Sequence, residues 1–165
     1  MALAAALRGR LAAQRERVRK RLREGAGGAV AWSAQTLVLS PDRRRVLLQR
    51  HAGGAYDGRW TGFIEPLAQL AVPPPDRVAA ILARHSGGLI REGDLRSVRC
   101  WAQFEFYELD GSGVPPNVEL ELVATLSHDR VPPASASPLL AWFDRTEVPY
   151  SEMPKDDEVG LALTC

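Results

Sequence analysis

The sequence predicts a single α+β domain in which several strands surround one central helix. Runs rich in β-branched and aromatic residues recur along most of the chain and are separated by turn residues. One helix-like stretch lies between a proline-rich segment and a glycine pair near the middle of the sequence. No internal repeat is visible, so these elements indicate one layered unit with mixed connections between its strands.

The composition is that of an ordinary globular protein with a core of its own. The chain has 165 residues, of which 45% are hydrophobic and 25% charged. Its two cysteines, Cys100 and Cys165, are too few for a disulfide framework or a thiolate metal site, so we expect an intracellular, reducing compartment. No apolar run reaches the roughly 20 residues that a membrane-spanning helix requires.

Positive charge is concentrated at the amino-terminal end. Residues 1–24 carry eight arginine and lysine residues against two glutamates, a net charge of +6. The remaining residues carry thirteen basic against eighteen acidic side chains, a net charge of −5. Such asymmetry is typical of a tail that binds an acidic partner. The acidic remainder gives no reason to expect nucleic acid on the main domain.

Residues 1–25 are predicted to form a basic amphipathic helical arm ahead of a domain that spans residues 26–165. Alanine, leucine and arginine favour helix, and an apolar stripe is formed by Leu7, Leu11, Val18 and Leu22. Three interpretations remain open: an organelle transit peptide, a helix packed on its own domain, and an arm that docks on an acidic protein surface or on nucleic acid. We favour the docking arm and expect no cleaved presequence.

Two strands and a loop open the domain. The run from Val30 to Ser40 is rich in β-forming residues and ends at a Pro-Asp turn signal. A short strand from Val46 to Gln49 follows the basic turn of residues 43–45, which we interpret as a solvated hairpin tip. Residues 51–58 contain several glycines and predict a loop.

The central helix is predicted between Asp76 and Gly87. Three prolines at residues 73–75 form a rigid entry, and Asp76 is a candidate N-cap. Val78, Ile81 and Leu82 supply its buried face. The glycine pair at residues 87–88 is a typical helix stop.

Strands resume after the helix. One is predicted from Val98 to Leu109, where polar and apolar residues alternate, and another from Val118 to Leu126. Residues 110–113 form a hairpin-type turn between them. A further strand spans Leu139 to Phe143, and a brief closing helix spans Asp157 to Leu163.

From Gln35 to Leu163 the order of these segments resembles the Nudix hydrolase fold, in particular its oxidised-purine nucleoside triphosphatase (8-oxo-dGTPase) branch. The similarity is carried by residues 35–39, 46–48, 58–63, 104–106, 141–143 and 153–157. The resemblance implies an α/β/α sandwich with a mixed sheet, here preceded by the basic arm. It also implies a helix whose glutamates bind Mg²⁺ for hydrolysis of a nucleotide phosphoanhydride.

The catalytic residues of that family are missing at the matching positions. Its motif arginine falls at Ala80, one glutamate at Ile81, and the glutamate pair at Arg84 and His85. None of these side chains offers the carboxylate oxygens that hold Mg²⁺ and so activate water. We therefore expect a degenerate site with no catalytic residue, no metal and no cofactor, unless an active form uses relocated ligands.

Two other possible metal ligands are considered and set aside. His85 has no second ligand four residues away on the helix. Glu65 stands where the family has a glycine, and Glu105 lies in a strand pattern. We interpret both glutamates as surface or turn residues.

The base pocket that the resemblance implies is half retained. Thr36, Phe104, Asp156 and Asp157 match pocket positions, and Thr61 stands where an asparagine contacts the base. Pro154 replaces the stacking tryptophan, which removes about 1–3 kcal/mol of base stacking. The two aspartates fit a helix N-terminus equally well, so a purine nucleotide is a secondary candidate partner.

The sequence thus predicts a non-catalytic Nudix-like domain, a pseudoenzyme that serves as a structural subunit of a larger assembly. We expect it to dock on other protein subunits through residues 1–25. Two alternatives remain open: a nucleotide-binding sensor in which Arg84 faces phosphate, and an active Mg²⁺-dependent nucleoside triphosphate pyrophosphohydrolase. Cytoplasmic, cytoskeletal and organellar assemblies all fit the composition.

Overall fold

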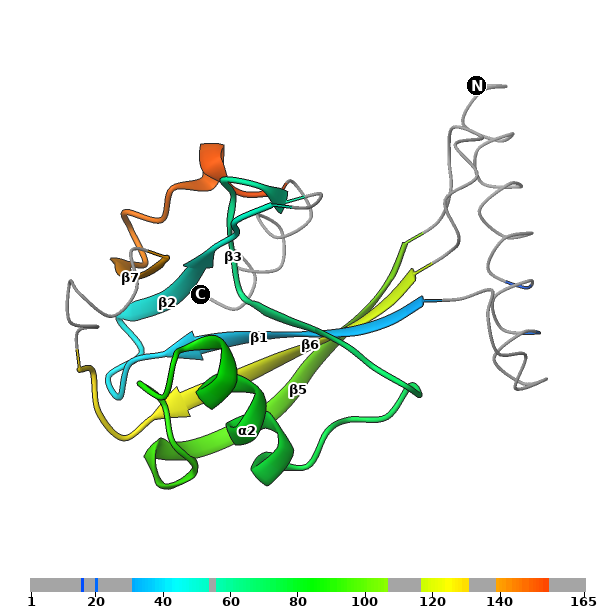
Figure 1. Ribbon diagram of the computed structural model, residues 1–165, viewed down its shortest axis with the longest axis horizontal. Helices are drawn as coiled ribbons and strands as arrows, with labels where there is room; N and C mark the ends of the chain where they lie inside the picture. The colour runs from blue at the N-terminus through cyan, green and yellow to red at the C-terminus, as the bar shows by residue number, and fades with distance from the viewer. Residues whose placement is uncertain are drawn as a thin grey trace.

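The computed structural model describes residues 31–53, 56–106, 117–130 and 139–154, with the single residues Glu16 and Lys20. The described residues form a mixed seven-stranded sheet with helix α2 on one face (Figure 1). Glu16 and Lys20 are helical and exposed. The rest of the predicted arm, the turn at residues 110–113 and the closing helix at residues 157–163 lie outside the described residues.

Strand β1 (Ala31–Leu39) lies at the centre of the sheet. It pairs in parallel with β6 (Asn117–Leu126), which pairs antiparallel with the long strand β5 (Leu95–Phe106). On its other edge, β1 pairs antiparallel first with β4 (Phe63–Pro66) and then, at its C-terminal end, with β2 (Arg45–Arg50). The connections are therefore mixed, as predicted for an α+β domain.

Strand β2 carries two further short partners. It pairs antiparallel with β3 (Trp60–Thr61) and with β7 (Leu140–Asp144). The predicted strands before and after the helix match β1, β2, β5, β6 and β7 to within three residues at each described boundary. The sequence interpretation missed β3 and β4, because strands of two and four residues are too short to show an alternating pattern.

Helix α2 (Pro75–His85) begins one residue earlier than predicted. Pro74 is the N-cap in an extended conformation, and no side chain caps the helix. The prediction that Asp76 is the N-cap is therefore wrong. Pro75 at the first helical position fixes the start of the helix, and Asp76 lies in the first turn, where an acidic side chain interacts favourably with the helix dipole.

The glycine pair ends α2 as predicted. Gly87 and Gly88 have φ angles of 61° and 84°, in the left-handed region that favours glycine. The N–H of Gly88 donates to the carbonyl of Ala83 at 2.8 Å, and the N–H of Gly87 to the carbonyl of Arg84 at 3.4 Å. These two backbone hydrogen bonds end the helix directly after Arg84 and His85.

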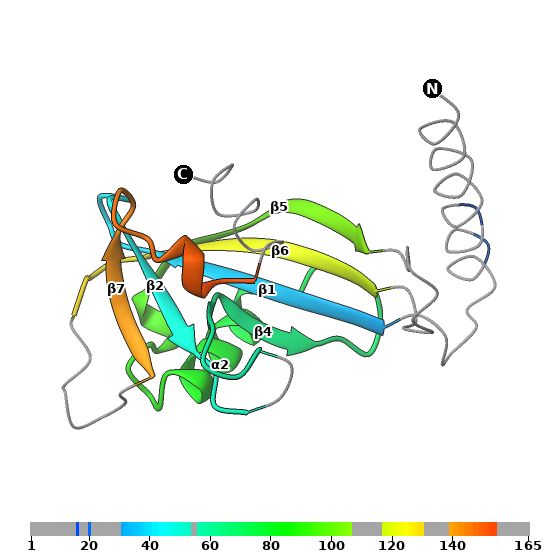
Figure 2. The same cartoon turned by 90° about the horizontal axis from the view of Figure 1, so that it is seen from above.

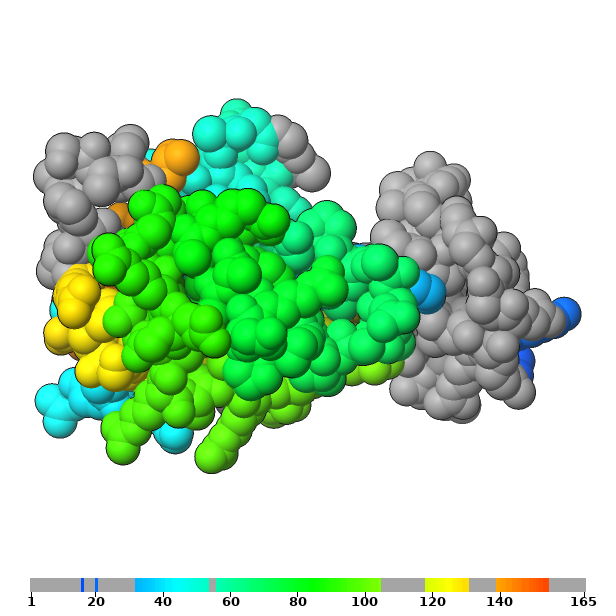
Figure 3. Space-filling view, turned by 60° about the horizontal axis from the view of Figure 1, so that its bottom comes forward, coloured from blue at the N-terminus to red at the C-terminus, as the bar shows by residue number. Residues whose placement is uncertain are grey.

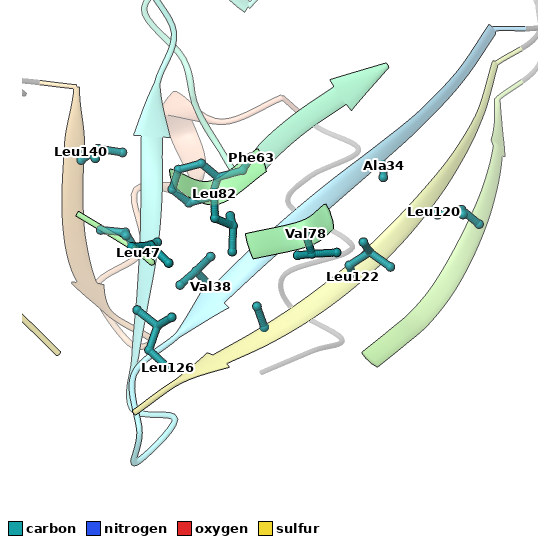
Figure 4. Close-up of a cluster of buried hydrophobic side chains, with 12 residues drawn as sticks. Ala34, Val38, Leu47, Phe63, Val78, Leu82, Leu120, Leu122, Leu126 and Leu140 are labelled. Carbon is teal, nitrogen blue, oxygen red and sulfur yellow. The ribbon is translucent and has the colours of Figure 1, made fainter. Parts of the chain in front are cut away.

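Two apolar clusters fill the two sides of the sheet. Val78 and Leu82 of α2 pack on Val38 and Phe63 in the cluster drawn in Figure 4. The cluster on the opposite face contains Leu37, Leu39, Val46, Leu48, Trp60, Val148 and Met153. Side chains alternate along a strand, so successive residues of β1 serve different clusters.

Figure 2 shows α2 on one side of the sheet only, and Figure 3 looks onto the face covered by α2 and by the segment before it (green). The predicted fold class, α+β with a mixed sheet of the Nudix type, is confirmed. Among the described residues, no helix is both long and apolar enough to cross a membrane.

Candidate functional site

The four residues predicted to stand in place of the family's catalytic side chains lie in the C-terminal half of α2. Ala80 is exposed, whereas Ile81 is buried with 6% of its surface exposed. Arg84 and His85 occupy the last turn, and both reach the neighbouring strand β4. Ile81 thus packs in the interior, and the polar side chains at the end of the helix are those of Arg84 and His85.

Glu65 on β4 is the shared partner of both side chains. Its Oε2 lies 2.5 Å from Nη2 of Arg84 and 3.4 Å from Nε2 of His85. Glu65 pairs with Ala34 of β1, which belongs to the core cluster beneath α2, so its carboxylate faces the helix. The interpretation of Glu65 as a surface or turn residue is therefore wrong. Its side chain is only 20% exposed, because the strand holds it against α2.

His85 is held from three sides. Its Nδ1 lies 3.2 Å from Oε1 of Gln49 on β2, and its Nε2 faces Glu65. The ring packs edge-on against Phe63, with ring centroids 6.2 Å apart. Both polar neighbours present acceptor oxygens, so a ring nitrogen that carries a proton donates to the neighbour that it faces. Gln49, Glu65, Arg84 and His85 are together called the helix-end cluster.

The charge of Glu65 is set by competing effects. Burial alone raises the pKa of its carboxyl, but hydrogen bonds and positive charge from Arg84 and His85 outweigh burial and hold the pKa below its ordinary value. At neutral pH, Glu65 is therefore an ionised carboxylate that is already bound by donors of the protein itself.

A second polar pair lies beside the helix-end cluster. Thr61 is completely buried on β3, and its hydroxyl donates to the carbonyl of Gly62 at 2.7 Å. The same hydroxyl oxygen lies 2.8 Å from Nε2 of His51, which therefore acts as the donor. Burial, and then the charge of His85, lower the pKa of His51. Thr61 thus uses its hydroxyl within the protein.

The helix-end cluster does not fit a Mg²⁺ ion. Mg²⁺ requires a near-octahedral set of oxygen ligands, several of them anionic. The cluster offers one carboxylate, and a cation there has to displace the guanidinium of Arg84. Across the part of the chain that the structure describes, no group of three or more His, Cys, Asp or Glu side chains is arranged to hold a metal.

The residues of the implied base pocket are not gathered on one face of the sheet. Thr36 alternates with Leu37 and so points toward α2. Phe104 pairs with Glu119 on the opposite face of the sheet. Thr61 is engaged by His51, and the two aspartates at residues 156–157 lie outside the described residues.

Sequence reasoning missed two members of this site. Nothing in the pattern of β2 distinguishes Gln49 from the other polar residues of the strand, and His51 follows the strand in the segment predicted to be a loop. The pairing of Glu65 with Arg84 did leave a signal, because opposite charges replace a glycine and a glutamate at two positions of the same motif.

Comparisons with known proteins return matches only at the level of structure. No family model and no curated protein matches this sequence. The NUDIX domain of Shewanella oneidensis NrtR, solved with ADP ribose, matches with a TM-score of 0.55 and 14% identity over 83% of this chain and 87% of that chain.

Two further solved structures are similar over a comparable share of the chain. The dihydroneopterin triphosphate pyrophosphohydrolase of E. coli matches with a TM-score of 0.53 and 13% identity, over 80% of this chain and 92% of that chain. The C-terminal domain of mouse MUTYH, solved in complex with human PCNA, matches with a TM-score of 0.54 and 18% identity, over 81% and 86%. At these identities the likeness concerns architecture alone: the described part of this chain has the fold of the Nudix hydrolases.

Proposed function

We propose that this chain is a non-catalytic Nudix-fold domain that serves as a structural subunit of a larger assembly and docks through residues 1–25. The observation that carries the proposal is the ion pair between Glu65 and Arg84. It occupies the end of the helix that resembles the family's metal-binding helix. Because the guanidinium of Arg84 already neutralises the carboxylate of Glu65, this carboxylate does not attract a divalent cation.

The rest of the helix supports the same proposal. Ile81 is buried, with 6% of its surface exposed, and an unpaired carboxylate in its place would be strongly destabilising. Phosphoanhydride hydrolysis relies on metal to neutralise charge on the leaving phosphates. A site with a single occupied carboxylate lacks that means of stabilising the transition state.

The arm is assigned to docking because of its charge. Residues 1–24 carry a net charge of +6 against −5 for the remainder. A basic helix of this length is marginal in water on its own and gains stability from an acidic surface. The MUTYH domain with a similar fold was solved in complex with another protein, which is consistent with a binding role for such a domain.

A nucleotide sensor is the second candidate, and one observation favours it. The side chain of Arg84 is 62% exposed, so its guanidinium retains donors for a phosphate beyond the contact with Glu65. The NrtR domain with a similar fold was solved with ADP ribose. In this alternative the chain binds a nucleotide without metal and does not cleave it.

Calorimetric titration of the full chain with ATP, GTP and dGTP, with and without Mg²⁺, separates these functions. The structural role predicts no binding heat in either condition and no pyrophosphate release. Binding that needs no metal, and that an Arg84→Gln variant loses, supports the sensor. Pyrophosphate release that scales with protein concentration in independent preparations contradicts a non-catalytic domain.

The arm is tested on native assemblies. The full chain should co-fractionate with a high-mass complex, whereas a chain without residues 1–25 should elute as a free domain with an unchanged melting temperature. A variant with Arg15, Arg19 and Arg23 changed to Gln keeps the helix propensity and isolates the role of charge. If the shortened chain still co-fractionates with the complex, the docking role of the arm is wrong.

A further inference from the structure

A polar group lies within the sheet on the face away from α2. In the parallel register of β1 and β6, Ser33 pairs with Glu119 and Gln35 pairs with Glu121. The hydroxyl of Ser33 donates to Oε2 of Glu119 at 3.0 Å. These four side chains alternate with the residues that point to α2, so they share one face of two neighbouring strands.

Glu121 is buried without a hydrogen-bond partner. It is 2% exposed and its strand partner Gln35 is 3% exposed. Within the described ranges, neither carboxyl oxygen of Glu121 nor Oε1 of Gln35 meets a hydrogen-bond donor. An ionised carboxylate in such surroundings is very costly, whereas a protonated one is tolerated. The geometry alone therefore points to a neutral acid.

The charged neighbours of Glu121 do not relieve this cost. Its partner on β1 is Gln35 and its partner on β5 is Ala102, both uncharged. The nearest acid on the same face is Glu119, two residues away on β6, and like charge disfavours ionisation. On the same face, Arg99 of β5 pairs with Val123, is exposed and makes no ion pair with Glu121 among the described residues.

We propose that Glu121 is a proton-controlled switch: it is a neutral acid in the folded domain, and its ionisation weakens the contact between β6 and β1. Both strands are central and the carboxyl lies against the sheet face that they share, so a charge there is relieved only when water reaches that face or the strands separate. The switch acts on the integrity of the sheet and does not depend on whether the domain is catalytic.

Glu121 titrates close to neutral pH, so changes of pH near neutrality change its charge. Burial first, and then the charge of Glu119, raise the pKa of Glu121 to about 7 from an ordinary 4.5. The folded state therefore binds this proton more tightly than the unfolded state does. The stabilisation by the proton is complete in acid, and it is lost as the pH rises from the ordinary pKa through the folded one.

Urea denaturation of the full chain between about pH 5 and pH 8.5 tests the linkage. For the wild type, the folding equilibrium constant contributed by Glu121 should fall by up to about tenfold per pH unit, and on the order of a hundredfold in total. Glu121→Gln, which keeps the shape and removes the charge, should lose this dependence and exceed the wild type above pH 7. Glu147→Gln, at an exposed turn, should follow the wild type.

Comparing the wild type with Glu121→Gln removes the contributions of other titrating groups to the pH dependence of stability. The pKa of His51 is lowered, so His51 alone makes stability rise with pH, which is the opposite direction. The difference between wild type and Glu121→Gln isolates the carboxyl. Equal slopes for these two proteins overturn the proposal.

Two further measurements follow the ionisation of Glu121 directly in the wild-type protein. In a protein with ¹³C-labelled glutamate side chains, one carboxyl should titrate near pH 7, and this signal should be missing in Glu121→Gln. Backbone amides of β1 and β6 should exchange faster above that pH than intrinsic base catalysis accounts for. If every glutamate titrates in the ordinary acidic range, or if exchange follows the intrinsic rate alone, the switch does not exist.

Discussion

Nη2 of Arg84 at the end of α2 and Oε2 of Glu65 in β4 lie 2.5 Å apart, at the place where the family resemblance implies a metal between carboxylates. His85 reaches the same oxygen and is braced by Gln49 and Phe63. The helix is therefore linked to the strand by charges of opposite sign within the protein.

Reversing one charge of this pair should destabilise the domain. Arg84→Glu places a second carboxylate against Glu65, and the double variant Glu65→Arg/Arg84→Glu should recover part of the loss. Arg84 is largely exposed, so solvent screening limits the coupling free energy to about 1 kcal/mol or less. Urea denaturation of the four proteins of the double-mutant cycle measures this energy. Arg91→Glu, which also reverses an exposed arginine, is the control. Equal destabilisation by Arg84→Glu and Arg91→Glu contradicts a specific interaction between Arg84 and Glu65.

The same pair predicts a dependence of stability on acid. Because the pKa of Glu65 is lowered on folding, the ionised group contributes stability above its ordinary pKa of 4.5, and this contribution is lost as the pH falls through the folded pKa. Wild type should therefore exceed Glu65→Gln in thermal midpoint at neutral pH and approach it in acid. A difference that stays constant from pH 7 to pH 3 rules out this origin.

Carboxylates restored to the helix end should bring back metal binding. Arg84→Glu/His85→Glu, together with the native Glu65, presents three carboxylates in place of one and removes the competing cation. Calorimetry with Mn²⁺ should detect binding in this variant and none in the wild type. Arg84→Gln/His85→Gln removes the same two side chains without adding negative charge and should show no heat of Mn²⁺ binding. Without binding in the carboxylate variant, the helix-end cluster does not lie where a metal can be held.

Gly62, which joins β3 to β4, is packed closely against β1. A Cβ atom at this position would lie 2.8 Å from Cγ of Gln35 and 2.9 Å from the carbonyl oxygen of Thr36. Gly62→Ala should cost about 1–3 kcal/mol, because a buried backbone atom cannot move aside freely. Gly93→Ala is the matched control, since nothing lies within 4 Å of its added Cβ. Urea denaturation should show the loss for Gly62→Ala only.

Local sequence patterns were sufficient for the long elements. A run rich in β-forming residues predicts β1, alternation predicts β5 and β6, and the proline entry with the glycine exit predicts α2. These signals are local because burial repeats with the period of each element. β3 and β4 are defined instead by their partners on β2 and β1. No pattern within two or four residues specifies such pairing.

The helix-end cluster shows the same division. Comparison with the family motif predicts that the metal-binding glutamates are replaced by Ile81, Arg84 and His85. It could not establish that Glu65, nineteen residues before Arg84, is their partner. That contact depends on the register of β4 on β1, which turns Glu65 toward α2.

By itself, the sequence determined the fold class and the positions of the main strands and helix, and it predicted the loss of the family's metal ligands, because each depends on local spacing and residue type. Only the tertiary structure decided that Glu65 joins Arg84 and His85, and that the carboxyl of Glu121 and Oε1 of Gln35 meet no donor among the described residues. Charges and polar groups acquire partners, or lose water, through strand register and layer packing, which bring together residues that are distant in the chain.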